Sequence, residues 1–146
     1  MRLLVIPAAM ILFMSVDDAA DAVKKDMERL EGTWSMVAGE ANGTPMPESF
    51  LKGSKRVAKD DITTVTIGGM PFMKAKFTVD PSKTPKAIDY MMLEGLTKGK
   101  TQLGIYEFDG DRVKFCFASP DMPRPTDFTA KAGSGRAFSV WRRDKK

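Results

Sequence analysis

The chain has 146 residues, a formal net charge of +4, one cysteine and no histidine. This length suits a single domain, and a chain without histidine cannot build Ser-His-Asp or Cys-His nucleophile systems or most zinc sites. One cysteine cannot form an internal disulfide, so the hydrophobic core must hold the domain together. The lysines are spread along the sequence, which indicates solvated faces and argues against a nucleic-acid partner.

The N-terminus has the pattern of an export signal. Arg2 precedes an apolar run over 3–14, and Ala20 and Ala22 place small residues at the two positions that a signal peptidase reads. We therefore predict a signal peptide over 1–22 and a protein that is periplasmic or extracellular. The apolar run is too short for a permanent membrane span, so no transmembrane anchor is expected after cleavage. The alternative interpretation of this run is a buried or surface helix.

The predicted mature chain, 23–146, begins with a short helix and continues with strands. Val23, Met27 and Leu30 recur at helical spacing, and Gly32 ends the helix. The apolar period then changes to two, and eight strands are predicted at about 33–40, 55–58, 62–67, 72–79, 86–93, 101–108, 111–118 and 136–142. Because mostly short loops join them, we expect an all-β, eight-stranded antiparallel up-and-down barrel, in which closure removes the exposed sheet edges.

The strongest local signal is a hairpin around Asp109-Gly110, a typical two-residue turn. If these two residues form the whole loop, Phe108 pairs with Asp111. The more apolar face of the hairpin is assigned inward, and it holds Tyr106, Phe108, Val113, Phe115 and Phe117. Cys116 then faces outward, either as a small packing residue or, beside Lys114, as a reactive thiol.

A set of short motifs runs through the chain: Leu30-x-Gly32-x-Trp34, Asp80-Pro81-x-Lys83-x-Pro85-Lys86-x-Ile88-Asp89, Gly99-Lys100-Thr101, Gly104-Ile105-Tyr106, Asp109-Gly110-Asp111, Cys116-Phe117-Ala118, Arg124-Pro125-Thr126 and Gly133-Ser134-Gly135. With these motifs, the chain from Leu30 to Arg143 resembles a family of small exported bacterial proteins that have a lipocalin-like fold and no assigned activity. The resemblance implies a calycin-type barrel and implies little about chemistry.

The Gly-x-Trp motif also resembles that of the wider lipocalins. There the tryptophan plugs the closed end of the barrel, and a basic residue at the end of the last strand packs across it. The resemblance therefore implies a pair between Trp34 and Arg142, with Arg143 as the alternative partner. The mature chain is short for a lipocalin and lacks the usual disulfide and C-terminal helix, which argues against a roomy cavity.

One rim of an up-and-down barrel gathers alternate loops, here 43–49, 68–71, 94–100 and 120–135. Met46, Met70 and Met122 fall in these loops, and methionine is common at adaptable apolar surfaces. We predict that Met46 and Met122 line an opening; the alternative is that they cover a filled core. The candidate ligand-binding residues of the interior and rim are Trp34, Met36, Met46, Met70, Met73, Tyr106, Phe115, Phe117, Met122 and Phe128.

The segment 124–128 is stiff, with prolines around an arginine and an aromatic side chain. We expect it to fold over the barrel mouth as a lid with Phe128 as its anchor. The alternative is an exposed recognition surface.

Three other patterns carry no chemistry. The stretch 95–101 imitates a phosphate-binding loop, but a strand follows it and the helix N-terminus that binds phosphate is missing. The acidic pairs Asp60-Asp61 and Asp109/Asp111 are typical turn formers. We therefore predict no catalytic residue, metal site or cofactor.

The sequence favours a non-enzymatic exported binding module that carries a small apolar or amphipathic ligand in its barrel. The alternative is a solid barrel that contacts another protein through its rim loops, as an inhibitor or an envelope-associated protein. An enzyme of unfamiliar type is the third hypothesis.

Overall fold

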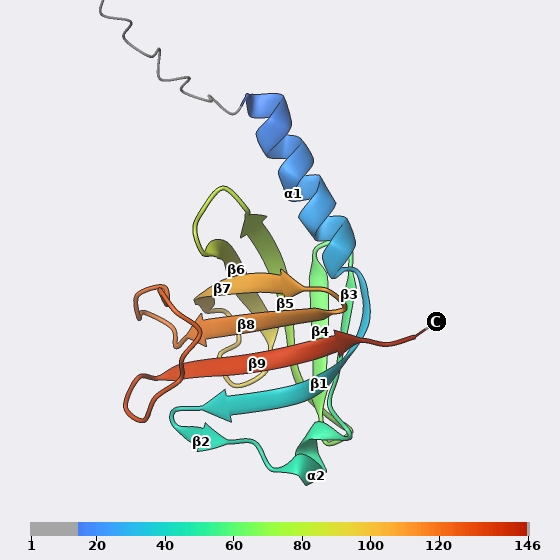
Figure 1. Cartoon of the computed structure of the whole chain (residues 1–146). Helices are drawn as coiled ribbons and strands as arrows, with labels where there is room; N and C mark the ends of the chain where they lie inside the picture. Colours follow the sequence, from blue (N-terminus) through green and yellow to red (C-terminus); the bar gives the residue numbers. More distant parts are fainter. Residues whose placement is uncertain (1–14, 146) are drawn as a thin grey trace, which may run out of the picture.

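Eight antiparallel strands form a closed barrel with one helix against it in the computed structural model, which describes residues 15–145 (Figure 1). The elements are α1 (Val16–Leu30), β1 (Gly32–Ala41), β2 (Thr44–Pro45), α2 (Glu48–Leu51), β3 (Lys55–Lys59), β4 (Ile62–Ile67), β5 (Met70–Asp80), β6 (Lys86–Glu94), β7 (Thr101–Asp109), β8 (Arg112–Ala118) and β9 (Arg136–Arg143). Each barrel strand pairs with the next in sequence, and β9 pairs back with β1. The predicted lipocalin-like up-and-down barrel is confirmed.

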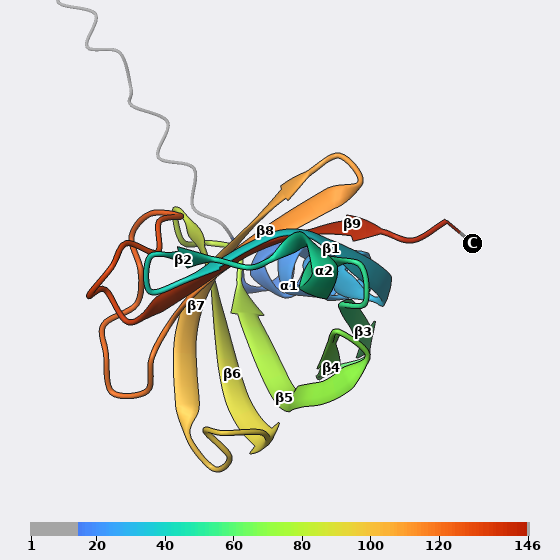
Figure 2. The same cartoon turned by 90° about the horizontal axis from the view of Figure 1, so that it is seen from below.

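The strands curve around one interior, with α1 on the far side when the barrel is seen from below (Figure 2). One end of the barrel carries the C-terminal end of α1 and the turns after β3, β5 and β7. The opposite end, which we call the rim, carries β2, α2 and the connections 68–69, 95–100 and 119–135. The strand β2 is a two-residue extension that pairs with the end of β1 and takes no part in the ring.

The helix α1 begins at Val16, seven residues before the predicted helix. The Ser15 side chain accepts a hydrogen bond from the Asp18 backbone N–H at 3.1 Å, and acidic residues occupy the first turn, which stabilises this end. The predicted cleavage point after Ala22 therefore lies inside α1, and residues 1–14 of the predicted signal lie outside the described residues. Within 15–145, no helix is long and apolar enough to cross a membrane.

The helix packs against the barrel only through its second half. Every residue from 15 to 21 is exposed, whereas Val23 and Met27 pack against the core and Leu30 belongs to it. This is the apolar side that the helical spacing predicted.

The β7–β8 hairpin differs from its predicted register by two residues. The turn is Gly110-Asp111 rather than Asp109-Gly110, and Phe108 pairs with Val113. Gly110 has φ +59°, the conformation that a type II′ turn requires at its first central position. Because a shift of two residues preserves the faces of a strand, the inward set that was predicted for this hairpin still faces the core.

Candidate ligand cavity

Trp34 closes the end of the barrel beneath α1. Its indole is 1% exposed, and Nε1 donates a hydrogen bond to the Leu30 carbonyl at 3.0 Å. The cation over its ring is Arg143, 4.2 Å from the ring centroid. The predicted partner Arg142 is exposed and pairs with Ser35 on the outward side of the strand. The pair Trp34–Arg142 is therefore wrong, and the alternative Arg143 is the partner.

Tyr106 joins the barrel to α1 and does not contact the cavity described below. Its hydroxyl donates to the buried Asp26 carboxylate at 2.6 Å, and Lys86 donates to the same oxygen at 2.9 Å. Burial and the adjacent carboxylate raise the pKa of Tyr106 well above its ordinary value. The prediction that Tyr106 forms part of the ligand-contacting wall is wrong, because its hydroxyl is hydrogen-bonded to Asp26 of α1.

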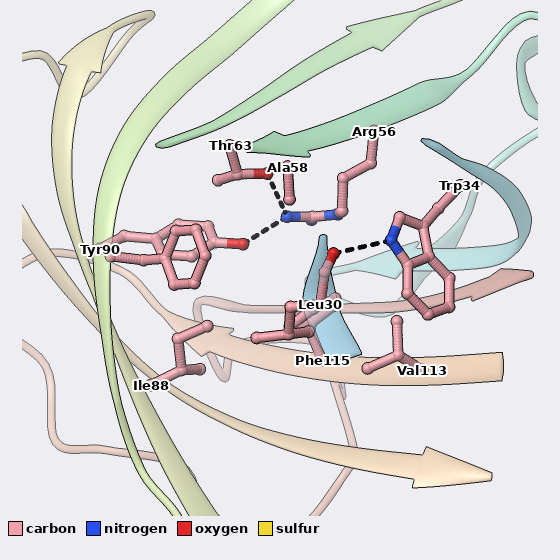
Figure 3. Close-up of a pocket in the computed structure, with 10 residues that line it drawn as sticks. Leu30, Trp34, Arg56, Ala58, Thr63, Ile88, Tyr90, Val113 and Phe115 are labelled. Carbon is pink, nitrogen blue, oxygen red and sulfur yellow. Dashed lines mark hydrogen bonds between the residues drawn. The ribbon is translucent and has the colours of Figure 1, made fainter. Parts of the chain in front are cut away.

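The barrel interior holds two spaces that meet at the side chain of Arg56. A cavity of about 230 Å³ lies toward the rim. A void of about 10 Å³ lies toward Trp34, and Figure 3 shows residues that line this void. The void is at the lower limit for a single water molecule. Phe115 and Trp34, two predicted ligand contacts, line this void rather than the cavity.

Most of the residues that line the cavity are apolar, and the cavity reaches solvent at the rim. Four of the predicted contacts line it: Met36, Met46, Met73 and Phe117. Its other lining residues include Val65, Met92, Tyr90 and Trp141 deep in the barrel and Glu40, Ala41, Phe72 and Phe138 near the rim. Because Phe72 and Ala41 are exposed while Tyr90 and Trp141 are buried, the cavity runs from the core to the surface. The alternative prediction, a core filled with side chains beneath the rim methionines, is inconsistent with this cavity.

The rim methionines divide into two groups. Met46 lines the opening, as predicted. Met122 is 46% exposed and Met70 is 69% exposed, and neither is among the cavity-lining residues of the described chain. The predicted opening between Met46 and Met122 is therefore correct only for Met46.

Arg56 is the functional candidate that the sequence did not single out. It extends inward from β3 and is 6% exposed, whereas its neighbour Val57 is 47% exposed on the outer face. Nη1 donates to Thr63 Oγ1 at 3.1 Å and to the Tyr90 hydroxyl. The guanidinium also lies over the rings of Phe115 and Trp141, 4.5 and 4.7 Å from their centroids. The cavity thus ends at a buried cation.

The segment after β8, residues 119–135, lies on the outer face of the barrel. Arg124 donates to the carbonyls of Ile88 and Gly104 and forms an ion pair with Asp89 at 2.7 Å. Phe128 lies under the Lys114 ammonium group, 4.4 Å from the ring centroid. Among the described residues, none of this segment lines the cavity. The lid prediction, with Phe128 as its anchor, is wrong, because Arg124 binds backbone carbonyls outside the barrel.

The same segment covers Cys116, which faces outward as predicted. The thiol Sγ donates to the Thr129 carbonyl at 3.4 Å, and burial raises its pKa to about 11. A covered thiol with a raised pKa supports the packing role and argues against a reactive thiol.

Comparisons of the chain with family models, with curated proteins and with solved structures find no match. Within residues 15–145, no cluster of three or more cysteine or acidic side chains is placed to hold a metal ion.

Proposed function

We propose that this protein is a non-enzymatic binding protein that carries a small amphipathic ligand inside its barrel. The observation that carries the proposal is the cavity of about 230 Å³, which leads from exposed residues at the rim to buried Tyr90 and Arg56. Ligand sites in proteins are typically concave and apolar, with a few polar groups that orient the ligand. Methionine walls such as Met36, Met73 and Met92 suit an alkyl chain, because thioether side chains adapt to irregular shapes.

We further propose that the protein is exported and belongs to the small bacterial lipocalin-like family that its motifs resemble. The closed ring of β1 and β3–β9 supports this relation. The contacts of α1 support export, because every described residue before Ala22 is exposed. Cleavage after Ala22 would leave Val23, Met27 and Leu30 packed against the barrel.

The alternative function, a contact with another protein through the rim, has one observation in its favour. Five large apolar side chains of rim segments are exposed: Phe50, Met70, Phe72, Leu96 and Met122. Exposed apolar patches of sufficient size often mark interaction sites. The cavity favours the carrier function over protein binding, because a protein that contacts its partner through the rim does not need a cavity inside its barrel.

Native mass spectrometry of protein purified gently from its source tests the carrier function. We expect a discrete extra mass that organic extraction removes, on a chain that begins at Val23. A bare polypeptide before and after extraction would instead support binding through the rim. A mature chain that retains 1–22 would contradict the proposed signal peptide.

A further inference from the structure

Arg56 is a buried charge without a charged partner. Arginine remains protonated in proteins, and burial of an unpaired charge is costly. Among residues 15–145, six ion pairs involve lysine or arginine, and Arg56 takes part in none of them. Its contacts are the neutral oxygens of Thr63 and Tyr90 and the faces of aromatic rings.

One edge of the Arg56 guanidinium is free of acceptors from the described residues. Both of its hydrogen bonds leave from Nη1, and the buried Nε has no partner. The Nε–Nη2 edge is one of the two-pronged edges with which arginine binds a carboxylate or phosphate through parallel hydrogen bonds. The Tyr90 hydroxyl accepts from Nη1, so its own proton remains available to an anion nearby.

Arg56 supplies the positive charge at the inner end of the cavity. The acidic residue nearest the opening, Glu40, pairs with Phe138, which in turn pairs with the outward-facing Cys116. Because residues that pair directly share a face of the sheet, the Glu40 carboxylate lies on the outer face and does not neutralise Arg56. The cavity is therefore positive at its inner end, and methionine and aromatic side chains line much of the space between Arg56 and the rim.

We propose that the ligand is an amphiphile with a single anionic headgroup, which enters head first and pairs with Arg56. The inference rests on the proposed carrier function and names its ligand class. The headgroup is a carboxylate, a phosphate ester or a sulfate ester. The alkyl tail lies against Met36, Met73 and Met92 and points to the rim.

Four ten-carbon probes that differ only in the headgroup test the inference on the wild-type protein: decanoate, decyl sulfate, decanol and decyltrimethylammonium. Their affinities are measured by isothermal titration calorimetry below micellar concentrations. We expect the two anions to bind about 10- to 100-fold more tightly than decanol, because a charge-assisted hydrogen bond in a buried site contributes that much. The cationic probe should bind most weakly. Decyl phosphate, titrated in parallel, separates a carboxylate preference from a general anion preference.

Substitution of Arg56 identifies the residue responsible. Arg56→Met should bring decanoate to the affinity of decanol, while decanol binding, which shows that the barrel is folded, stays within a few-fold of wild type. Lys59→Met, at the exposed end of the same strand, should leave all four affinities unchanged. If Arg56→Met does not fold, Tyr90→Phe should reduce decanoate binding more than decanol binding.

The outcomes separate the inference from the proposed function. Equal affinities for decanoate and decanol, or an anion preference that persists in Arg56→Met, would overturn the inference and leave the carrier function standing. A failure of all four probes to bind would overturn both.

Discussion

Arg143 links the last strand to both the core tryptophan and the end of α1. Its guanidinium lies 4.2 Å from the ring centroid of Trp34 and donates to the carbonyls of Glu31, at 2.6 Å, and Arg29. The carbonyls at a helix C-terminus lack intrahelical partners and carry partial negative charge, so a cation there is favourable. One side chain thus connects β9, β1 and α1 at the closed end of the barrel.

Substitution of this arginine should destabilise the fold. Arg143→Gln removes the cation–π contact and weakens the cap of α1, and we expect a loss of about 1–2 kcal/mol in the free energy of unfolding. The matched control is Arg142→Gln, because Arg142 is exposed on the same strand; a change within about 0.5 kcal/mol is expected for it. Urea unfolding measures both variants. Equal effects of the two substitutions would show that Arg143 has no special role.

The Tyr106 hydroxyl should contribute to the attachment of α1. Tyr106→Phe removes its hydrogen bond to Asp26 but leaves Lys86 as a partner of that carboxylate. We expect a loss of about 1 kcal/mol. Asp26→Ala should cost more, about 2–3 kcal/mol, because it leaves the Tyr106 hydroxyl buried without an acceptor. Denaturant unfolding of both variants checks this order, and a larger effect of Tyr106→Phe would contradict it.

The stability of the protein should fall in alkaline solution. Burial and nearby Asp26 raise the pKa of Tyr106, burial raises that of Tyr90, and burial raises that of Cys116 to about 11. The unfolded chain therefore releases protons first, from about pH 9 for the thiol and about pH 10 for the tyrosines, while the folded chain retains them. Unfolding is thus favoured as pH rises through this range.

Urea unfolding between pH 7 and 11, with tyrosinate absorbance followed on the native protein, measures this dependence. Tyrosinate should appear only together with unfolding. Ionisation of either tyrosine at about pH 10 in a chain that remains folded would contradict the prediction.

The barrel topology was predictable because its signals are local. Strand alternation and turn residues specify a meander, and even the two-residue error in the predicted register of the β7–β8 hairpin preserved the faces of both strands. The closed-end partner of Trp34 also follows from alternation. Trp141 faces inward, so Arg143, two residues later, does too.

The inward position of Arg56 at the inner end of the cavity could not be predicted from strand alternation and turn residues. In the β3 segment Lys55–Lys59, Val57 and Arg56 lie on opposite faces of the strand. Hydrophobicity alone would place Val57 toward the core, whereas in the structure Arg56 is the buried residue. The turn at Asp60-Asp61 decides the register, since it pairs Lys59 with Ile62 and therefore Arg56 with the buried Val65. The position of 119–135 depends on contacts of Arg124 with backbone carbonyls of β6 and β7, which no local pattern encodes.

Cys116 should be unreactive in the folded protein. It is buried beneath Thr129, and its raised pKa leaves little thiolate at neutral pH. A thiol-specific chromogenic reagent at pH 8 should label the native protein slowly and label it fully in denaturant. Rapid stoichiometric labelling without denaturant would show that the 119–135 segment opens readily or does not cover the thiol.

Gly104 controls the position of Phe117 and hence the width of the cavity. A Cβ at Gly104 would lie 2.4 Å from the ring of Phe117, the residue that pairs with Gly104 on β8. This ring packs at a tilt against Tyr90, with the ring centroids 4.1 Å apart, and it lines the cavity. Gly104→Ala should therefore displace this ring, lower stability by about 1–3 kcal/mol and weaken amphiphile binding.

A double-mutant cycle distinguishes this crowding from a general loss of backbone freedom. Phe117→Leu makes room for the new methyl group, so Gly104→Ala combined with Phe117→Leu should be more stable than the sum of the two single effects predicts. The free energy of unfolding and the decanol affinity are measured for all four proteins. Strict additivity would show that the ring and the methyl group do not compete for space, and that Gly104 serves the strand in another way.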